Sequence, residues 1–150
     1  MAEIDGISRK ILRELTSDGR IANTTLAERV GLSPSACLRR VQELERTGVI
    51  KGYRAVVDPA VLGTGFSTFL AVGLSNHDRE SQLIFERAVA RAPEVRECHN
   101  ITGTVEYILR IEVADIEAYK RFHTEVIGEI EVVKTLTTYV IMSSPKDERA

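Results

Sequence analysis

The segment from Gly31 to Leu44 constrains the fold most, because it contains the signals that end one helix and begin another. Gly31 suits the left-handed conformation at a helix end, Ser33 is a favourable N-cap, and Pro34 fits the first helical position. Apolar residues then recur at i, i+4 and i+7 on one predicted helical face: Cys37, Val41 and Leu44. The opposite face carries side chains suited to phosphates and base edges: Ser35, Arg39, Gln42 and Arg46. Taken alone, this pattern fits an ordinary surface helix as well as a DNA-binding one.

Two further helices are predicted before this segment. Asp5 can cap the first, whose apolar stripe ends at a turn over residues 17–20. For the second, over residues 21–30, Asn23 is a plausible N-cap, and Thr25 with Glu28 matches the capping-box spacing. A glycine corner between the second and third helices predicts a helix-turn-helix domain over residues 1–58, with the third helix entering the major groove.

The residues after the third helix have two interpretations. Gly48 should close the helix, and Lys51-Gly52 could turn between two short strands, because polar and apolar residues alternate over 53–57. Such a β-ribbon would be a wing, with Lys51 and Arg54 placed to touch phosphate. The alternative is a simple strand that leaves the domain. Pro59 and the glycines at 63 and 65 predict a linker over residues 59–65.

The C-terminal half predicts a second domain over residues 66–142. β-rich segments at 66–74, 95–101, 107–113 and 132–142 alternate with helical patterns at 81–91 and after Asp115. The order β-α-β-β-α-β is that of a ferredoxin-like domain, so the whole chain is predicted to be an α+β protein. Two helices on one sheet face leave the other face uncovered, which predicts packing against a second copy. Residues 143–150 are expected to form a polar, frayed tail.

Composition is consistent with a cytoplasmic protein. No run of 18 apolar residues indicates a membrane span, no secretion signal is apparent, and Cys37 and Cys98 are expected to be buried, reduced thiols. Residues 1–58 contain 10 Lys/Arg and 8 Asp/Glu, whereas residues 59–150 contain 10 and 14. The basic excess lies with the predicted recognition helix but is only +2, so useful DNA binding should need several copies.

The N-terminal half resembles the Lrp/AsnC (feast/famine) family of prokaryotic transcription regulators. The resemblance rests on Arg20–Asn23, Leu26-Ala27, Val30–Ser35, Cys37–Val41, Leu44-Glu45 and Gly48–Ile50. One departure is Ser8, where the family usually has Asp. The resemblance implies double-stranded DNA as a partner. We expect base-edge contacts from Ser35, Arg39 and Gln42. We expect phosphate contacts from Ser33, Arg40, Arg46, Lys51 and Arg54.

The resemblance continues into the C-terminal half. Residues 101–110 look like the family's effector loop, with Glu106 in place of the usual Asp. This implies a small-molecule effector, usually an amino acid, and a homodimer that assembles further, to an octamer. The implied effector-binding residues are Thr102, Gly103, Thr104, Val105, Glu106 and Tyr107. Backbone N–H groups at Gly103 could bind an α-carboxylate, and Glu106 an α-ammonium. Alternatively, Gly103 only makes the turn and Glu106 is solvated.

An enzyme is the competing hypothesis, because sirohaem decarboxylases resemble this family in fold. The sequence shows no cofactor-binding glycine loop, and its three histidines, His77, His99 and His123, lack metal-ligand spacing. We therefore expect no catalytic residue, metal or cofactor. An intact polar face on the third helix favours the regulator.

Overall fold

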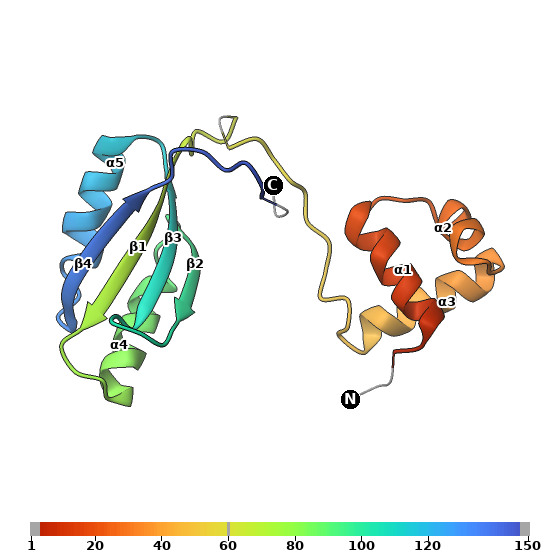
Figure 1. The fold of residues 1–150 in the computed structure, drawn as a ribbon, viewed down its shortest axis with the longest axis horizontal. Helices are drawn as coiled ribbons and strands as arrows, with labels where there is room; N and C mark the ends of the chain where they lie inside the picture. Colours follow the sequence, from red (N-terminus) through yellow and green to blue (C-terminus); the bar gives the residue numbers. More distant parts are fainter. Residues whose placement is uncertain (1–3, 60, 148–150) are drawn as a thin grey trace. The chain divides into compact units, whose positions relative to one another are not determined.

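Contacts divide the chain into two units, residues 1–55 and 56–150. The computed structural model describes residues 4–59 and 61–147 (Figure 1). Parts of three predicted segments lie outside the described residues: positions 1–3 of the N-terminal domain, position 60 of the linker and positions 148–150 of the tail. The division falls just before the predicted domain boundary at residue 58.

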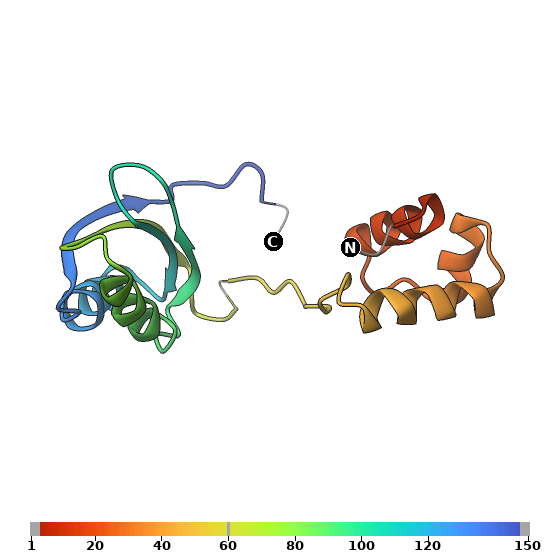
Figure 2. The same ribbon diagram turned by 90° about the horizontal axis from the view of Figure 1, so that it is seen from below.

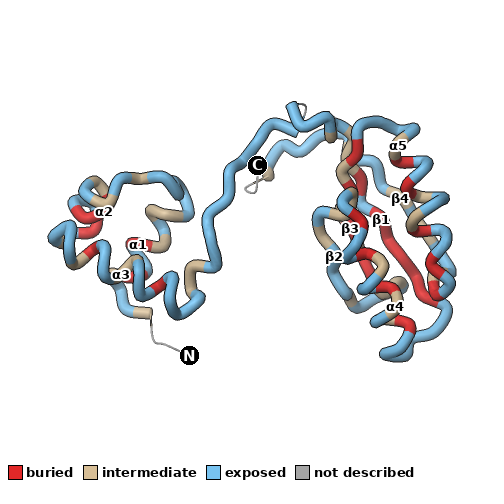
Figure 3. Tube along the Cα trace, turned by 180° about the vertical axis from the view of Figure 1, so that it is seen from behind, coloured by how far each residue is buried: buried red, intermediate tan, exposed pale blue. Residues whose placement is uncertain are grey.

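Three helices build the first unit: α1 (Gly6–Ser17), α2 (Asn23–Val30) and α3 (Pro34–Arg46). Each helix buries one apolar face, so one to three side chains from every helix form the core of this unit (Figure 3). Its buried members are Ile11, Leu26, Ala27, Val30, Cys37 and Leu44. The predicted helix-turn-helix arrangement is confirmed.

The ends of these helices mostly follow the predicted signals. Asp5 caps α1, since its Oδ1 accepts a hydrogen bond from the Ser8 N–H at 2.8 Å. Gly31 adopts φ 74° after α2, the left-handed conformation that a Cβ would strain. The predicted cap of α2 is wrong. Asn23 is the first helical residue, Ala22 occupies the N-cap position, and no side chain caps this helix.

The predicted wing is not formed by this chain. Residues 51–59 contain no strand, and an alternating segment forms one only with a neighbouring strand that completes its backbone hydrogen bonds. The segment is instead attached to the first unit at Tyr53, whose hydroxyl donates to Glu45 Oε1 at 3.0 Å. Residues 54–59 are exposed.

The second unit has the predicted β-α-β-β-α-β order. Its strands are β1 (Phe66–Leu74), β2 (Val95–Asn100), β3 (Tyr107–Val113) and β4 (Val133–Val140), and its helices are α4 (Arg79–Val89) and α5 (Ile116–Arg121). The antiparallel sheet has the order β2-β3-β1-β4, with Leu70 opposite Leu109 and Thr138. This is the ferredoxin-like topology, as predicted.

Both helices cover the same face of this sheet (Figure 2). The alternation of side chains along β3 puts Tyr107, Leu109, Ile111 and Val113 into the core beneath them. The other face of the sheet carries Phe69, Ile108 and Tyr139, with Phe69 and Tyr139 paired across strands. Tyr139 is 59% exposed, so this face has an uncovered apolar area in the single chain.

The two cysteines differ in their surroundings. Cys37 is buried in the core of the first unit, as predicted, and both thiols are free. The prediction is wrong for Cys98, which is exposed because its strand, β2, lies at the edge of the sheet.

The second helix of this unit departs from the prediction. Asp115 caps α5 as expected, but after Arg121 the chain continues as a π-helix, η1 (Phe122–Ile127). The wider turn brings Phe122 and Ile127 into the core. The sequence predicts an α-helical stripe of Ile116, Tyr119, His123, Val126 and Ile127 along one side. This prediction is partly wrong, because the structure leaves Ile116 57% exposed.

Residues 143–147 of the predicted polar tail form no helix or strand, and residues 143–146 are exposed. Asp147 Oδ2 lies 3.6 Å from Arg110 Nη2 on the uncovered face of the sheet. The same guanidinium group lies 2.9 Å from Glu112. The tail is thus tied back to β3 through charge. Among the described helices, none has the length and apolar character needed to cross a membrane.

Candidate DNA-recognition helix and ligand loop

The start of α3 is held by contacts across the helix-turn-helix corner. Ser33 Oγ accepts from the Ala36 N–H at 3.3 Å, which confirms the predicted N-cap. From α2, Asn23 Nδ2 donates to the Pro34 carbonyl at 2.8 Å. The Asn23 side chain therefore does not cap α2 but holds the first turn of α3 against α2. The N-terminus of α3 is therefore positioned rigidly.

The exposed face of α3 presents side chains that the fold does not use. Arg39 and Gln42 are exposed and make no hydrogen bond or ion pair with any other described residue. Ser35 lies one turn earlier, with its hydroxyl 3.3 Å from that of Ser33. Donors and acceptors left free on one helix face can bind base edges.

Sequence reasoning missed Leu38 on this face. Its side chain is 46% exposed although it is a large apolar residue. It lies three residues after Ser35 and four before Gln42, so the helical spacing itself could have identified it. An exposed leucine beside polar base readers is suited to a thymine methyl group.

Two arginines among the predicted phosphate contacts, Arg40 and Arg46, form ion pairs within the first unit. Arg40 Nη1 lies 2.7 Å from Asp5 Oδ2 and 3.2 Å from Ser8 Oγ, so it ties α3 to the start of α1. Arg46 forms two hydrogen bonds to Glu43, at 2.9 and 2.6 Å. The Arg46–Glu43 pair lies within α3, at a spacing of three residues that the sequence shows. The Arg40–Asp5 pair joins residues far apart in the chain, which spacing cannot indicate.

The same contacts shift the pKa of the partner carboxyl groups. The Ser8 backbone and hydroxyl, followed by Arg40, lower the pKa of Asp5 from 3.8 to about 2. The Arg46 guanidinium lowers the pKa of Glu43. Both carboxylates therefore stay charged at neutral pH and hold their arginines. Lys51 and Arg54, two further predicted phosphate contacts, lie exposed in the segment after α3.

The predicted effector loop connects β2 to β3. Thr102, Gly103 and Thr104 are exposed, and Val105 is half-buried. Gly103 has φ 141°, a backbone conformation that residues with a Cβ rarely adopt. The loop ends are fixed by backbone bonds, since the Ile101 N–H donates to the Glu106 carbonyl at 2.9 Å and the Glu106 N–H donates to the Val72 carbonyl at 3.1 Å. The exposed tip can present N–H groups to an anion.

Glu106 is largely buried, and each of its carboxylate oxygens has a partner within the second unit. Its Oε2 accepts from the Leu74 N–H at 2.6 Å, and its Oε1 lies 2.6 Å from His77 Nδ1. The Leu74 bond and then the charge of His77 lower the pKa of Glu106. The carboxylate therefore ties the loop to the end of β1. Neither partner was anticipated, because they lie about thirty residues earlier in the chain.

Tyr107, the last predicted effector residue, faces the core. Its ring is 4.7 Å from that of Phe85, and its hydroxyl donates to Glu86 Oε1 at 2.8 Å. Burial, followed by the Glu86 bond, raises the pKa of Tyr107 to about 12. Tyr107 is thus a structural residue of β3.

These two units define a class of protein: a helix-turn-helix DNA-binding regulator with a separate C-terminal α+β domain. Two family models match the chain accordingly. Residues 4–51 match a winged helix-turn-helix DNA-binding domain, and residues 67–150 match the Lrp/AsnC ligand binding domain. The chain therefore belongs to the Lrp/AsnC family of DNA-binding transcription regulators.

Individual relatives resemble the chain over nearly its whole length. The leucine-responsive regulatory protein of Escherichia coli (strain K12) is 39% identical over 144 residues, covering 96% of this chain and 88% of that protein. An AsnC family transcriptional regulator from Agrobacterium tumefaciens has a TM-score of 0.89 at 36% identity, covering 95% and 93% of the two chains. A transcriptional regulator from Neisseria meningitidis, solved as a complex with L-Met, has a TM-score of 0.91 at 30% identity, covering 97% and 94%. All three are named as regulators, which favours that function over the enzyme hypothesis.

Proposed function

We propose that this chain reads double-stranded DNA with the exposed face of α3. Ser35, Arg39 and Gln42 would contact base edges, with Leu38 against a thymine methyl group. The observation that carries this proposal is that Arg39 and Gln42 lie exposed on one helix face with no partner among the described residues. Ser33, Lys51 and Arg54 would contact phosphates. Arg40 and Arg46 would also contact phosphates. Each would either keep its bond to Asp5 or Glu43 while doing so, or exchange that bond for the phosphate.

The DNA proposal is tested on a site selected from a random duplex pool. Arg39→Ala should cost roughly 1–3 kcal/mol of specific binding, because a bidentate arginine contact to guanine is lost. Fluorescence anisotropy at fixed salt measures this loss. Arg87→Ala, an exposed arginine on α4, is the matched control and should bind like the wild type. Equal affinity of the Arg39 and Arg87 variants would reject the assignment.

We also propose that the loop from Thr102 to Val105 binds an amino-acid effector. Support comes from its exposed tip, from the positive φ of Gly103, and from the L-Met complex of the related Neisseria regulator. Glu106 enters this proposal as the residue that positions the loop, because both of its oxygens are already engaged. Effector binding would shift the population of DNA-binding states.

The effector proposal is tested by thermal shift with the twenty amino acids. The bound amino acid should raise the unfolding midpoint in wild-type protein, because it binds only the folded state. Glu106→Ala should remove most of this rise while leaving basal DNA affinity unchanged. Glu129→Ala, an exposed glutamate elsewhere, serves as the control. An equal rise in the Glu106 and Glu129 variants would count against the loop.

We propose a homodimer that assembles further, to an octamer. The uncovered sheet face supports it, since Phe69, Ile108 and Tyr139 lie together there. A dimer would place two copies of α3 on successive major grooves. It would also compensate for the small basic excess of one DNA-binding unit.

A further inference from the structure

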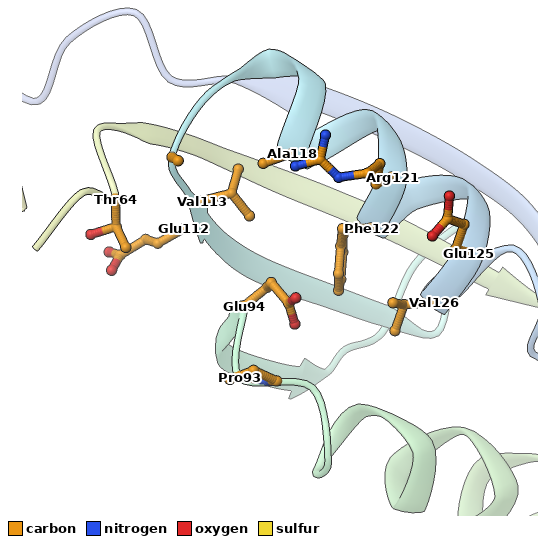
Figure 4. Close-up of a pocket in the computed structure, with 11 residues that line it drawn as sticks. Thr64, Pro93, Glu94, Glu112, Val113, Ala118, Arg121, Phe122, Glu125 and Val126 are labelled. Carbon is orange, nitrogen blue, oxygen red and sulfur yellow. The ribbon is translucent and has the colours of Figure 1, made fainter.

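A cavity of about 470 Å³ lies in the second unit, on the helix-covered side of the sheet and away from the loop over residues 101–106. It opens between α5 with η1 and the turn that leads into β2 (Figure 4). Its apolar wall consists of Val113, Ala118, Phe122 and Val126. Its volume is in the range of small-molecule sites. The proposed DNA-binding and effector functions leave it unused.

Three charged side chains on the rim of this cavity have no side-chain partner in the part of the chain that the structure describes. Glu94, Arg121 and Glu125 form no ion pair or side-chain hydrogen bond with any other described residue. The fourth charged lining residue, Glu112, is already neutralised, because Arg96 and Arg110 lie 3.3 and 2.9 Å from its oxygens. The cavity thus offers two unpaired carboxylates and one unpaired guanidinium group.

The π-helix accounts for this arrangement. The Gly128 N–H donates to the His123 carbonyl at 2.9 Å, five residues back, which widens the turn. Phe122 thereby packs into the core and forms the inner wall, while Arg121 and Glu125 stay at the rim (Figure 4). In the same view Glu94 extends into the space from the opposite side. Single π turns inside helices frequently occur at functional sites.

We infer that this cavity binds an amino acid that carries a second ammonium group on an unbranched stem, such as L-lysine or L-ornithine. Arg121 binds the α-carboxylate, because a guanidinium group pairs with a carboxylate through two parallel hydrogen bonds. Glu125 binds the α-ammonium group, and Glu94 binds the terminal ammonium group. The methylene stem lies on Phe122 and Val126. The site goes beyond the proposed effector loop and shares none of its residues.

Calorimetric titration of the full chain tests the inference with three ligands that differ by one group. L-Lysine should bind at least about tenfold more tightly than L-norleucine, which lacks the terminal ammonium group, and than cadaverine, which lacks the carboxylate. Arg121→Gln should weaken L-lysine binding by about tenfold or more. So should the double variant Glu94→Gln/Glu125→Gln.

Two further variants test whether L-lysine binds in this cavity. Lys120→Gln changes the neighbouring exposed cation, which does not line the cavity, and should leave L-lysine binding unchanged. Ala118→Leu fills the cavity without changing its charge and should abolish L-lysine binding. If Arg121→Gln fails to fold, this variant tests whether the ligand binds in the cavity. The inference is overturned if L-lysine does not bind, if norleucine binds equally well, or if the folded cavity variants bind like the wild type. It is also overturned if only Glu106→Ala removes binding, which would place the ligand at the loop instead.

Discussion

At the scale of single residues, the charged side chains of this protein separate into those that hold the fold and those left for ligands. Arg40 and Glu106 belong to the first kind, because each is engaged by partners about thirty residues away. Arg39 and Arg121 belong to the second kind, since neither has a partner among the described residues. Neighbouring arginines on one helix, Arg39 and Arg40, therefore have different roles.

The contacts of Asp5 with Ser8 and Arg40 predict a pH dependence of the first unit. The pKa of Asp5 falls from 3.8 to about 2 on folding, so its charge adds stability that is fully present above about pH 4. This stability is lost as the pH falls toward 2. Asp5→Asn should thus differ from the wild type in thermal unfolding midpoint above pH 4, with the difference shrinking between pH 4 and 2. A difference independent of pH would contradict the stabilising role of these contacts.

At the scale of helices and strands, the sequence predicts those features that depend only on residues close together in the chain. Asp5, Ser33 and Asp115 cap their helices as predicted, because each cap bonds a backbone N–H three residues on. The apolar residues at alternate positions of residues 107–113 likewise indicate the buried face of β3. These features involve only neighbouring residues.

Other elements could not be predicted, because they depend on distant parts of the chain. The wing needs a second strand that residues 51–59 do not find in this chain. The π-helix places Phe122 and Ile127 in the core, and a regular helical period cannot indicate such a wider turn. For the candidate sites, the free face of α3 was predictable from spacing. The distant partners of Arg40 and Glu106 were not.

The helix-turn-helix corner gives a prediction at this scale. Gly31→Ala should destabilise the first unit by roughly 1–2 kcal/mol, because its φ of 74° strains any residue with a Cβ. No atom lies within 4 Å of the added carbon, so the cost comes from the backbone alone. Gly6→Ala also meets open space but has no positive φ, and it should not destabilise. Urea unfolding measures both variants, and equal stabilities would show that the left-handed conformation of Gly31 carries no cost.

At the scale of the whole molecule, the sheet face opposite the helices is the surface on which the proposed assembly depends. Phe69 and Tyr139 form a cross-strand apolar pair there, 36% and 59% exposed in one chain. Burying such a pair between two copies removes apolar area from water. Charged residues around Arg110 border it, so the face is not uniformly apolar.

Phe69→Glu should break this assembly. Light scattering after gel filtration should show the mass fall to 16.7 kDa, that of one chain, because the charge would be buried against the partner's sheet. Leu83→Glu alters an exposed apolar residue on α4, on the helix side, and should keep the wild-type mass. A Phe69 variant of unchanged mass would show that copies associate through another surface.

Base reading by α3 is the central claim, and a base-substitution scan tests it most directly. Each base pair of the selected site is changed in turn, and affinity is measured for the wild type and for Arg39→Ala at one salt concentration. We predict at least one base pair whose change weakens the wild type by roughly 1–3 kcal/mol but leaves the variant unaffected, since the variant has already lost that contact. If both proteins show the same losses at every position, Arg39 does not read bases, and α3 is not used as proposed.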